Sequence, residues 1–76
     1  MTSKTIEKNS VLSSAFGEYI SKHPYILENI PQNAQIIMGD ENDRSFTQRN
    51  ARTFKRANGK LYQAVKGKHG WMIKKV

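Results

Sequence analysis

The stretch Ala34-Gln35-Ile36-Ile37-Met38 decides the fold that this sequence predicts. A turn, Ile30-Pro31-Gln32-Asn33, introduces this apolar run, and Gly39-Asp40 ends it. Successive side chains of a strand point to opposite faces, so Ile36 and Met38 point opposite to Ile37. Because the run is apolar on both sides, we predict a buried strand that neighbouring elements cover on two faces.

Two helical segments are predicted before this strand. Apolar residues recur at helical spacing from Val11 to Ile20, in a segment that starts at Ser10. Pro24 disfavours helical geometry at the residue before it, so the first helix should end near Lys22. A short helix from Tyr25 to Asn29 should follow. Residues 1–9 are polar and aperiodic, so we expect a flexible N-terminus there and a single domain over residues 10–76.

A longer helix is predicted after the acidic loop 40–43, whose Asp and Asn side chains are suitable N-caps. Residues 44–57 divide on a helical wheel into an apolar arc and a basic arc, and Asn58-Gly59 is typical of a C-cap. The last segment alternates as two strands joined by a hairpin loop, Gly67-Lys68-His69-Gly70. The predicted order is therefore α-α-β-α-β-β.

This order predicts a small α/β domain, on the border with α+β. A strand, a helix of about fourteen residues and a second strand have the proportions of a right-handed βαβ crossover, which makes the two strands parallel. The C-terminal hairpin then adds an antiparallel third strand. We expect a three-stranded mixed sheet with helices packed on it.

The composition excludes several classes of protein. The chain of 76 residues has no cysteine, hence no disulfide and no thiolate metal site, and two isolated histidines do not make a zinc site. No apolar run approaches the ~20 residues of a membrane helix, and the N-terminus lacks the apolar core of a signal peptide. We expect a cytoplasmic protein with no membrane contact.

The net charge of +7 is unevenly distributed. Residues 1–33 carry equal numbers of acidic and basic side chains, and residues 34–43 carry acidic ones alone. Residues 44–76 carry ten Lys and Arg side chains and no acid. This asymmetry is the most informative functional feature of the sequence, because a concentrated positive field attracts polyanions.

We therefore predict a domain that binds RNA or DNA phosphates through the basic helix face, with salt-dependent affinity and no base-specific readout. Lysines of the hairpin would continue the patch, and two aromatic residues would stack on unpaired bases where exposed. The predicted nucleic-acid-binding residues are Arg44, Arg49, Arg52, Lys55, Arg56, Lys66, Lys74, Tyr62 and Trp71. A solvated helix face with core aromatics explains the same residues equally well, and the sequence leaves both interpretations open.

A protein-interaction module is the alternative. Edge strands pair with other chains, so the C-terminal hairpin would form a homodimer or dock an acidic partner. A third interpretation is a metal-dependent phosphoryl-transfer enzyme that uses Asp40 and Asp43 to hold Mg²⁺, although helix capping explains these residues more simply.

No enzyme and no cofactor are predicted. Ser10, Ser13 and Ser14 lack both a nucleophile elbow and a histidine placed to activate them, and the scattered glycines form no phosphate loop. We expect His23 to close the turn between the first two helices by bonding a backbone carbonyl. Asn50 lies within the apolar arc of its helix and should tie that helix to a loop backbone.

A resemblance supports the predicted order. The pattern Phe16-x-x-Tyr19-Ile20-x-x-His23-Pro24, followed by Leu27-x-x-Ile30-Pro31-x-x-Ala34-x-Ile36-Ile37, resembles a family of short bacterial and archaeal proteins known as a domain of unknown function. The resemblance covers roughly residues 15–66 and implies an α-β-α-β order without any activity. This chain differs from the family pattern in having Tyr25 where Glu is usual and in being far more basic after residue 43.

Overall fold

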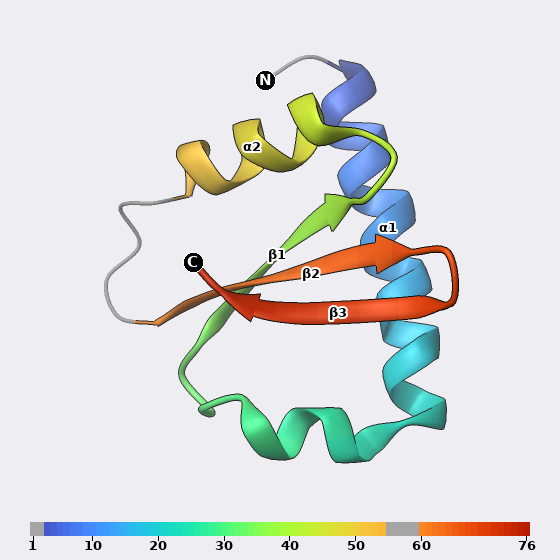
Figure 1. The fold of residues 1–76 in the computed structure, drawn as a ribbon, viewed down its shortest axis with the longest axis vertical. Coiled ribbons are helices and arrows are strands. Elements are labelled where there is room, and N and C mark those ends of the chain that lie inside the picture. The colour runs from blue at the N-terminus through green and yellow to red at the C-terminus, as the bar shows by residue number, and fades with distance from the viewer. Residues whose placement is uncertain (1–2, 55–59) are drawn as a thin grey trace.

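The computed structural model describes residues 3–54 and 60–76. Its elements follow one another as two helices, a strand, a helix and two strands (Figure 1). They are α1 (Ser3–Lys22), the 3₁₀ helix η1 (Pro24–Asn29), β1 (Gln35–Asp40), α2 (Arg44–Thr53), β2 (Leu61–Gly67) and β3 (Gly70–Lys75). The predicted α-α-β-α-β-β order and the small α/β fold are confirmed.

The three strands form one mixed sheet in the order β1-β2-β3. β1 runs parallel to β2, with Met38 opposite Ala64, and β3 runs antiparallel to β2, with Ile73 opposite Ala64. The parallel pair is joined by α2, as the predicted βαβ connection requires. The hairpin that joins β2 to β3 turns at Lys68 and His69.

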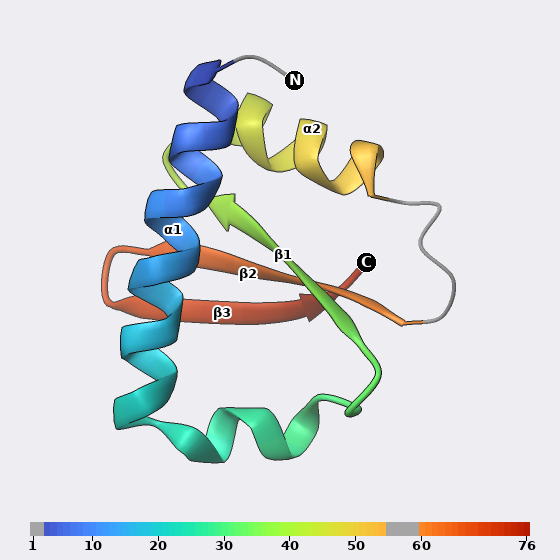
Figure 2. The same ribbon diagram turned by 180° about the vertical axis from the view of Figure 1, so that it is seen from behind.

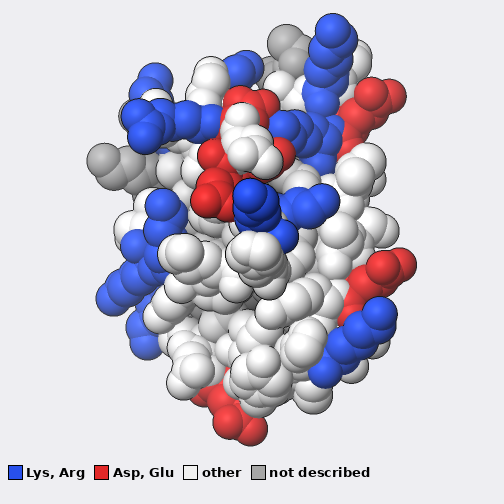
Figure 3. All heavy atoms as spheres, turned by 45° about the vertical axis from the view of Figure 1, so that its right-hand side comes forward, with Lys and Arg blue, Asp and Glu red and all other residues white. Residues whose placement is uncertain are grey.

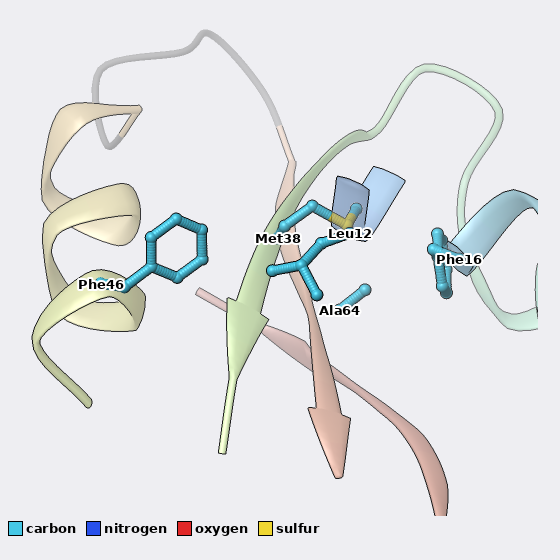
Figure 4. Close-up of a cluster of buried hydrophobic side chains, with 5 residues drawn as sticks. All are labelled: Leu12, Phe16, Met38, Phe46 and Ala64. Carbon is cyan, nitrogen blue, oxygen red and sulfur yellow. The ribbon is translucent and has the colours of Figure 1, made fainter. Parts of the chain in front are cut away.

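Helices cover β1 on both sides. α1 lies behind the β2–β3 hairpin in Figure 1 and in front of it in Figure 2, so it covers one face of the sheet. Figure 4 shows Leu12 and Phe16 of α1 on one side of β1 and Phe46 of α2 on the other. Met38 lies between them and is 6% exposed, and Ile37 is 5% exposed. The predicted burial of this strand on two faces is confirmed.

One edge of the sheet is the outer edge of β1. The Gln35 amide donates to the Lys60 carbonyl and the Glu41 amide donates to the Lys66 carbonyl, each at 2.9 Å, so both amides face β2. Hydrogen bonds of a parallel strand alternate from one side to the other. The peptide groups of Ile36, Met38 and Asp40 therefore face outward, away from β2.

Polar side chains cover this edge at Met38 and Asp40, in the second half of β1. The Met38 carbonyl accepts from Asn50 Nδ2 at 2.9 Å and from Gln63 Nε2 at 3.2 Å. The Asp40 amide donates to Thr47 Oγ1 at 2.8 Å. Because buried backbone groups must be hydrogen-bonded, these side chains take the place that a fourth strand would otherwise occupy.

The first helix is longer than predicted. A start at Ser10 after a flexible segment 1–9 is wrong for residues 3–9, because α1 begins at Ser3. Lys8 Nζ lies 2.8 Å from Asp43 Oδ2, and Asn9 Nδ2 donates to Asn50 Oδ1 at 3.3 Å. These polar contacts with the loop before α2 and with α2 itself hold the first turns of α1, and hydrophobic periodicity does not register them.

The other helix bounds agree more closely. η1 has a proline in its first turn, as predicted for the short second helix, and α2 ends at Thr53 with Phe54 as its C-cap. The remainder of the predicted helix, residues 55–57, and the Asn58-Gly59 cap lie outside the described residues. Over residues 3–54 and 60–76, no helix has the length and apolar character needed to cross a membrane.

Candidate nucleic-acid interface

α2 turns three arginines toward solvent because its inner side is held against the sheet. Asp43 caps this helix, since its Oδ1 accepts from the amide of Phe46 at 3.1 Å, which confirms the predicted capping role. Phe46 is 4% exposed, whereas Arg44, Arg49 and Arg52 are all exposed. Within residues 44–54, the predicted apolar arc therefore faces inward and the predicted basic arc faces outward.

Lys74 extends this surface from the sheet. It pairs with Gln63 across the β2–β3 ladder, and Gln63 Nε2 donates to the Thr47 carbonyl of α2 at 2.9 Å. Lys74 therefore lies on the sheet face that α2 covers. We call Arg44, Arg49, Arg52 and Lys74 the α2 basic surface. The predicted site residues Lys55 and Arg56 lie outside the described residues.

Three other predicted site residues lie on the opposite face of the sheet, the face on which α1 packs. The Trp71 ring packs on Phe16, with 5.0 Å between the ring centroids. Tyr62 is half-buried and lines an apolar hollow beside η1 with Ile26. Lys66 is opposite Trp71 in the ladder and shares its face. The structure therefore does not bring Tyr62 and Lys66 together with the α2 basic surface.

A cavity of about 640 Å³ lies between the start of α2 and the β2–β3 hairpin. It lies beyond the carboxyl ends of the parallel strands, where open α/β sheets bind ligands. Val65 and Met72 contribute apolar surface, and Trp71 also lines the cavity. The basic side chains along it are Arg44, Lys68, His69 and Lys74. It therefore joins part of the α2 basic surface to an apolar floor.

The acidic loop beside this cavity is held by contacts within the protein. Lys8 Nζ lies 3.1 Å from Asp40 Oδ2 and 2.8 Å from Asp43 Oδ2. Glu41 Oε2 accepts from the amide of Lys68 at 3.1 Å. Asp40 and Asp43 therefore connect the loop before α2 to α1, and Glu41 connects the same loop to the hairpin.

The ion pair between Lys8 and Asp43 also changes the pKa of these two residues. Hydrogen bonds from Lys8 and from the Phe46 amide hold the pKa of Asp43 below its usual value of 3.8. The hydrogen bond to Asp43, together with Asp40, raises the pKa of Lys8 above 10.5. Both groups are therefore charged over the whole physiological range.

The loop does not gather metal ligands. Among the described residues, no group of three or more His, Asp or Glu side chains is placed to hold a metal ion. The two aspartates considered for Mg²⁺, Asp40 and Asp43, instead share the ammonium group of Lys8.

Basic groups are distributed differently on the two sides of the molecule. In Figure 3 the acidic loop lies near the middle of the upper half, and on the side of α1, at the right, acidic and basic groups alternate. On the left, basic groups have few acidic neighbours. Within the described residues, the ion pairs all involve Lys8, so no side chain of the α2 basic surface forms one, although the charge of Arg49 contributes to lowering the pKa of Asp43.

The contacts of His23 and Asn50 differ in detail from their predicted structural roles. His23 closes the turn after α1 through its own amide, which donates to the Tyr19 carbonyl at 3.0 Å. Its ring packs between Tyr19 and Tyr25 rather than bonding a backbone carbonyl. Asn50 ties α2 to the Met38 carbonyl of β1 rather than to a loop, and Asn50 Nδ2 also donates to Asn9 Oδ1 at 2.8 Å.

Sequence reasoning missed Gln63, which is 2% exposed. Its side-chain amide donates to the Met38 carbonyl of β1 and to the Thr47 carbonyl of α2. Gln63 therefore holds the first turn of α2 against β1 and β2. The available signal was a Gln on the apolar face of an alternating strand, between Leu61 and Val65.

These features define a small α/β domain with a basic surface on one helix and an adjoining cavity. The chain belongs to a family of unknown function, DUF5647, whose family model matches residues 4–65. The resemblance found in the sequence is thereby confirmed. No curated protein and no solved structure matches the chain.

Proposed function

We propose that this chain is a cytoplasmic, non-enzymatic domain that binds RNA or DNA through the α2 basic surface. The observation that carries the proposal is the exposure of Arg44, Arg49 and Arg52 on one helix. This helix lies in the part of the chain, residues 44–76, that has ten Lys and Arg side chains and no Asp or Glu. Guanidinium groups bond phosphate oxygens in a bidentate geometry, so such a helix face suits a phosphate backbone.

The same residues contribute little to the fold, which supports a binding role. Arg49 makes a 3.3 Å contact with Ser45 Oγ on the exposed helix surface. The inner residues of α2 carry the packing, as the burial of Phe46 and Asn50 shows. Solubility alone would be served equally well by a mixture of acids and bases.

The test is the titration of a labelled oligonucleotide at two salt concentrations. We expect binding at low salt that weakens steeply at high salt. The variant Arg49→Gln/Arg52→Gln should lower the slope of log K against log salt by about 1.8 for a duplex, about 0.9 per lost phosphate contact. The control Lys4→Gln/Lys22→Gln removes the same charge from exposed positions on α1 and should change the slope little. No binding at low salt would refute the proposal.

A second function is favoured by the free edge of β3. The Val76 amide donates to the Leu61 carbonyl at 2.8 Å, so by antiparallel alternation the peptide groups of Trp71, Ile73 and Lys75 face outward. No strand within residues 3–54 and 60–76 pairs with this edge. In this alternative, an extended acidic segment of a partner protein pairs with β3.

A homodimer through the same edge is the other form of this alternative. Antiparallel self-pairing centred on Ile73 would set Lys75 of each copy opposite Trp71 of the other, so no two lysines would lie directly opposite each other on the paired strands. Light scattering at high protein concentration tests it. A monomer would exclude the homodimer and leave the acidic segment as the partner for this edge.

A further inference from the structure

We infer that the cavity between α2 and the hairpin receives one unstacked nucleotide of a single strand. Its base would lie on the apolar floor, and its phosphate would bind Arg44 and Lys74. The inference rests on the proposed function and adds to it the form of nucleic acid that is bound. Four observations support it.

The first is the size of the cavity. At about 640 Å³ it falls within the range of roughly 300–1,000 Å³ that is typical of small-ligand sites. A nucleotide fills such a space, whereas a duplex presents its bases stacked and paired and would contact only the rim.

The second is the apolar floor. Met72 is 67% exposed, on the sheet face that carries Val65 and Lys74. Its thioether is soft and polarisable, and such groups make favourable contacts with aromatic rings. A base laid against Met72 would cover apolar surface that is otherwise in contact with water.

The third is the charge at the rim. Arg44 and Lys74 both line the cavity, and within the described residues neither forms an ion pair. Their charges are therefore available to a phosphate group. Arg49 and Arg52 do not line the cavity, so Arg44 and Lys74 are the members of the α2 basic surface that adjoin its apolar floor.

The fourth is the state of the nearby acids. Asp40 is held by Lys8, and Glu41 Oε2 accepts from the Lys68 amide at 3.1 Å. On the hairpin side of the cavity the negative charge of Glu41 offsets the positive charge of Lys68, since both side chains line it. Among the described residues, Arg44 and Lys74 have no such acidic neighbour in an ion pair, so a phosphate is directed toward them, with the base toward Met72.

The experiment compares one oligonucleotide sequence as a single strand and as a duplex, at low salt, by fluorescence anisotropy. Met72→Gln removes the apolar contact without changing charge or much volume, at a position exposed enough to leave the fold intact. We expect this variant to bind the single strand about two- to tenfold more weakly, since a contact between a thioether and an aromatic ring contributes about 0.3–1.5 kcal/mol. Its affinity for the duplex should equal that of the unchanged protein.

Val11→Gln is the matched control, because Val11 is also 67% exposed but lies on α1 away from the cavity. It should change neither affinity. Adenosine monophosphate, titrated against the labelled amides, should shift the signals of Val65, Gly67 and Met72. An unchanged single-strand affinity in Met72→Gln would overturn this inference and leave the proposed function standing. Absence of binding to both oligonucleotides would overturn both.

Discussion

Gly39 and Gly17 differ in the space that is available to a side chain at each position. A Cβ at Gly39 would lie 3.0 Å from Thr47 Cγ2 and 3.1 Å from Val65 Cγ2, so a side chain there would push α2 away from the sheet. A Cβ at Gly17, on the exposed side of α1, would meet nothing within 4 Å. Gly39 is therefore required for close packing, and Gly17 is simply tolerated in a helix.

The first prediction follows from this contrast. Gly39→Ala should lower the free energy of unfolding by about 1–3 kcal/mol, because the tight contacts can be relieved only by shifting α2. Gly17→Ala should raise it by about 0.5–1 kcal/mol, because alanine is the better helix former. Urea denaturation followed by circular dichroism measures both changes. Equal effects of the two substitutions would contradict the packing described for Gly39.

Asn50 shows how far a single residue can be interpreted from sequence. Its place in the apolar arc predicted burial and a tie to a backbone, and both are found, since Asn50 is 1% exposed and bonds the Met38 carbonyl. The particular acceptor was not predictable. It depends on which peptide groups of β1 face outward, and that follows from the register with β2 rather than from the helix.

At the scale of elements, the pattern of apolar residues predicted both α-helices and the three strands, whereas Pro24 predicted η1, which has no buried residue. The apolar pattern failed at the start of α1, where polar contacts of Lys8 and Asn9 replace apolar packing. It also could not assign the faces of the hairpin. Alternation separates Trp71 from Lys74, but only the position of α1 decides that Trp71 packs on Phe16.

The second prediction concerns the contact between α1 and the loop before α2. Lys8→Met keeps the hydrocarbon chain over the Phe46 ring, which the Lys8 Nζ approaches at 4.9 Å, and removes the ion pairs with Asp40 and Asp43. At neutral pH the variant should melt at a lower temperature than the unchanged protein. Lys4→Met, at an exposed position on the same helix, should have little effect.

The pH dependence of this difference has a definite sign. The pKa of Asp43 is lowered in the folded state, so its contribution is present above 3.8 and is lost as the pH falls through the lowered value. The pKa of Lys8 is raised, so its contribution is present below 10.5 and is lost as the pH rises through the raised value. Thermal melts should therefore show the largest difference near neutrality and a smaller one at both extremes. A difference that is independent of pH would contradict the ion pair.

At the scale of the whole molecule, the fold arranges cations that the chain carries in any conformation. The unfolded chain has the same net charge of +7, so a ligand that responds to charge alone binds the folded and unfolded forms alike. A ligand that needs the α2 basic surface binds the folded form more tightly. Thermal stability in the presence of an oligonucleotide therefore separates an arranged site from mere basicity.

The third prediction is that a single-stranded oligonucleotide raises the melting temperature at low salt. With free ligand at about 100 times Kd, preferential binding to the folded form adds about 2.7 kcal/mol. For a domain of this size, that corresponds to a rise of roughly 10–20 °C. Differential scanning fluorimetry measures it. High salt should abolish the rise, Arg49→Gln/Arg52→Gln should reduce it, and Lys4→Gln/Lys22→Gln should leave it nearly unchanged. If the oligonucleotide binds but the melting temperature stays constant or falls, the folded state offers no arranged site, and its cations act only through their number.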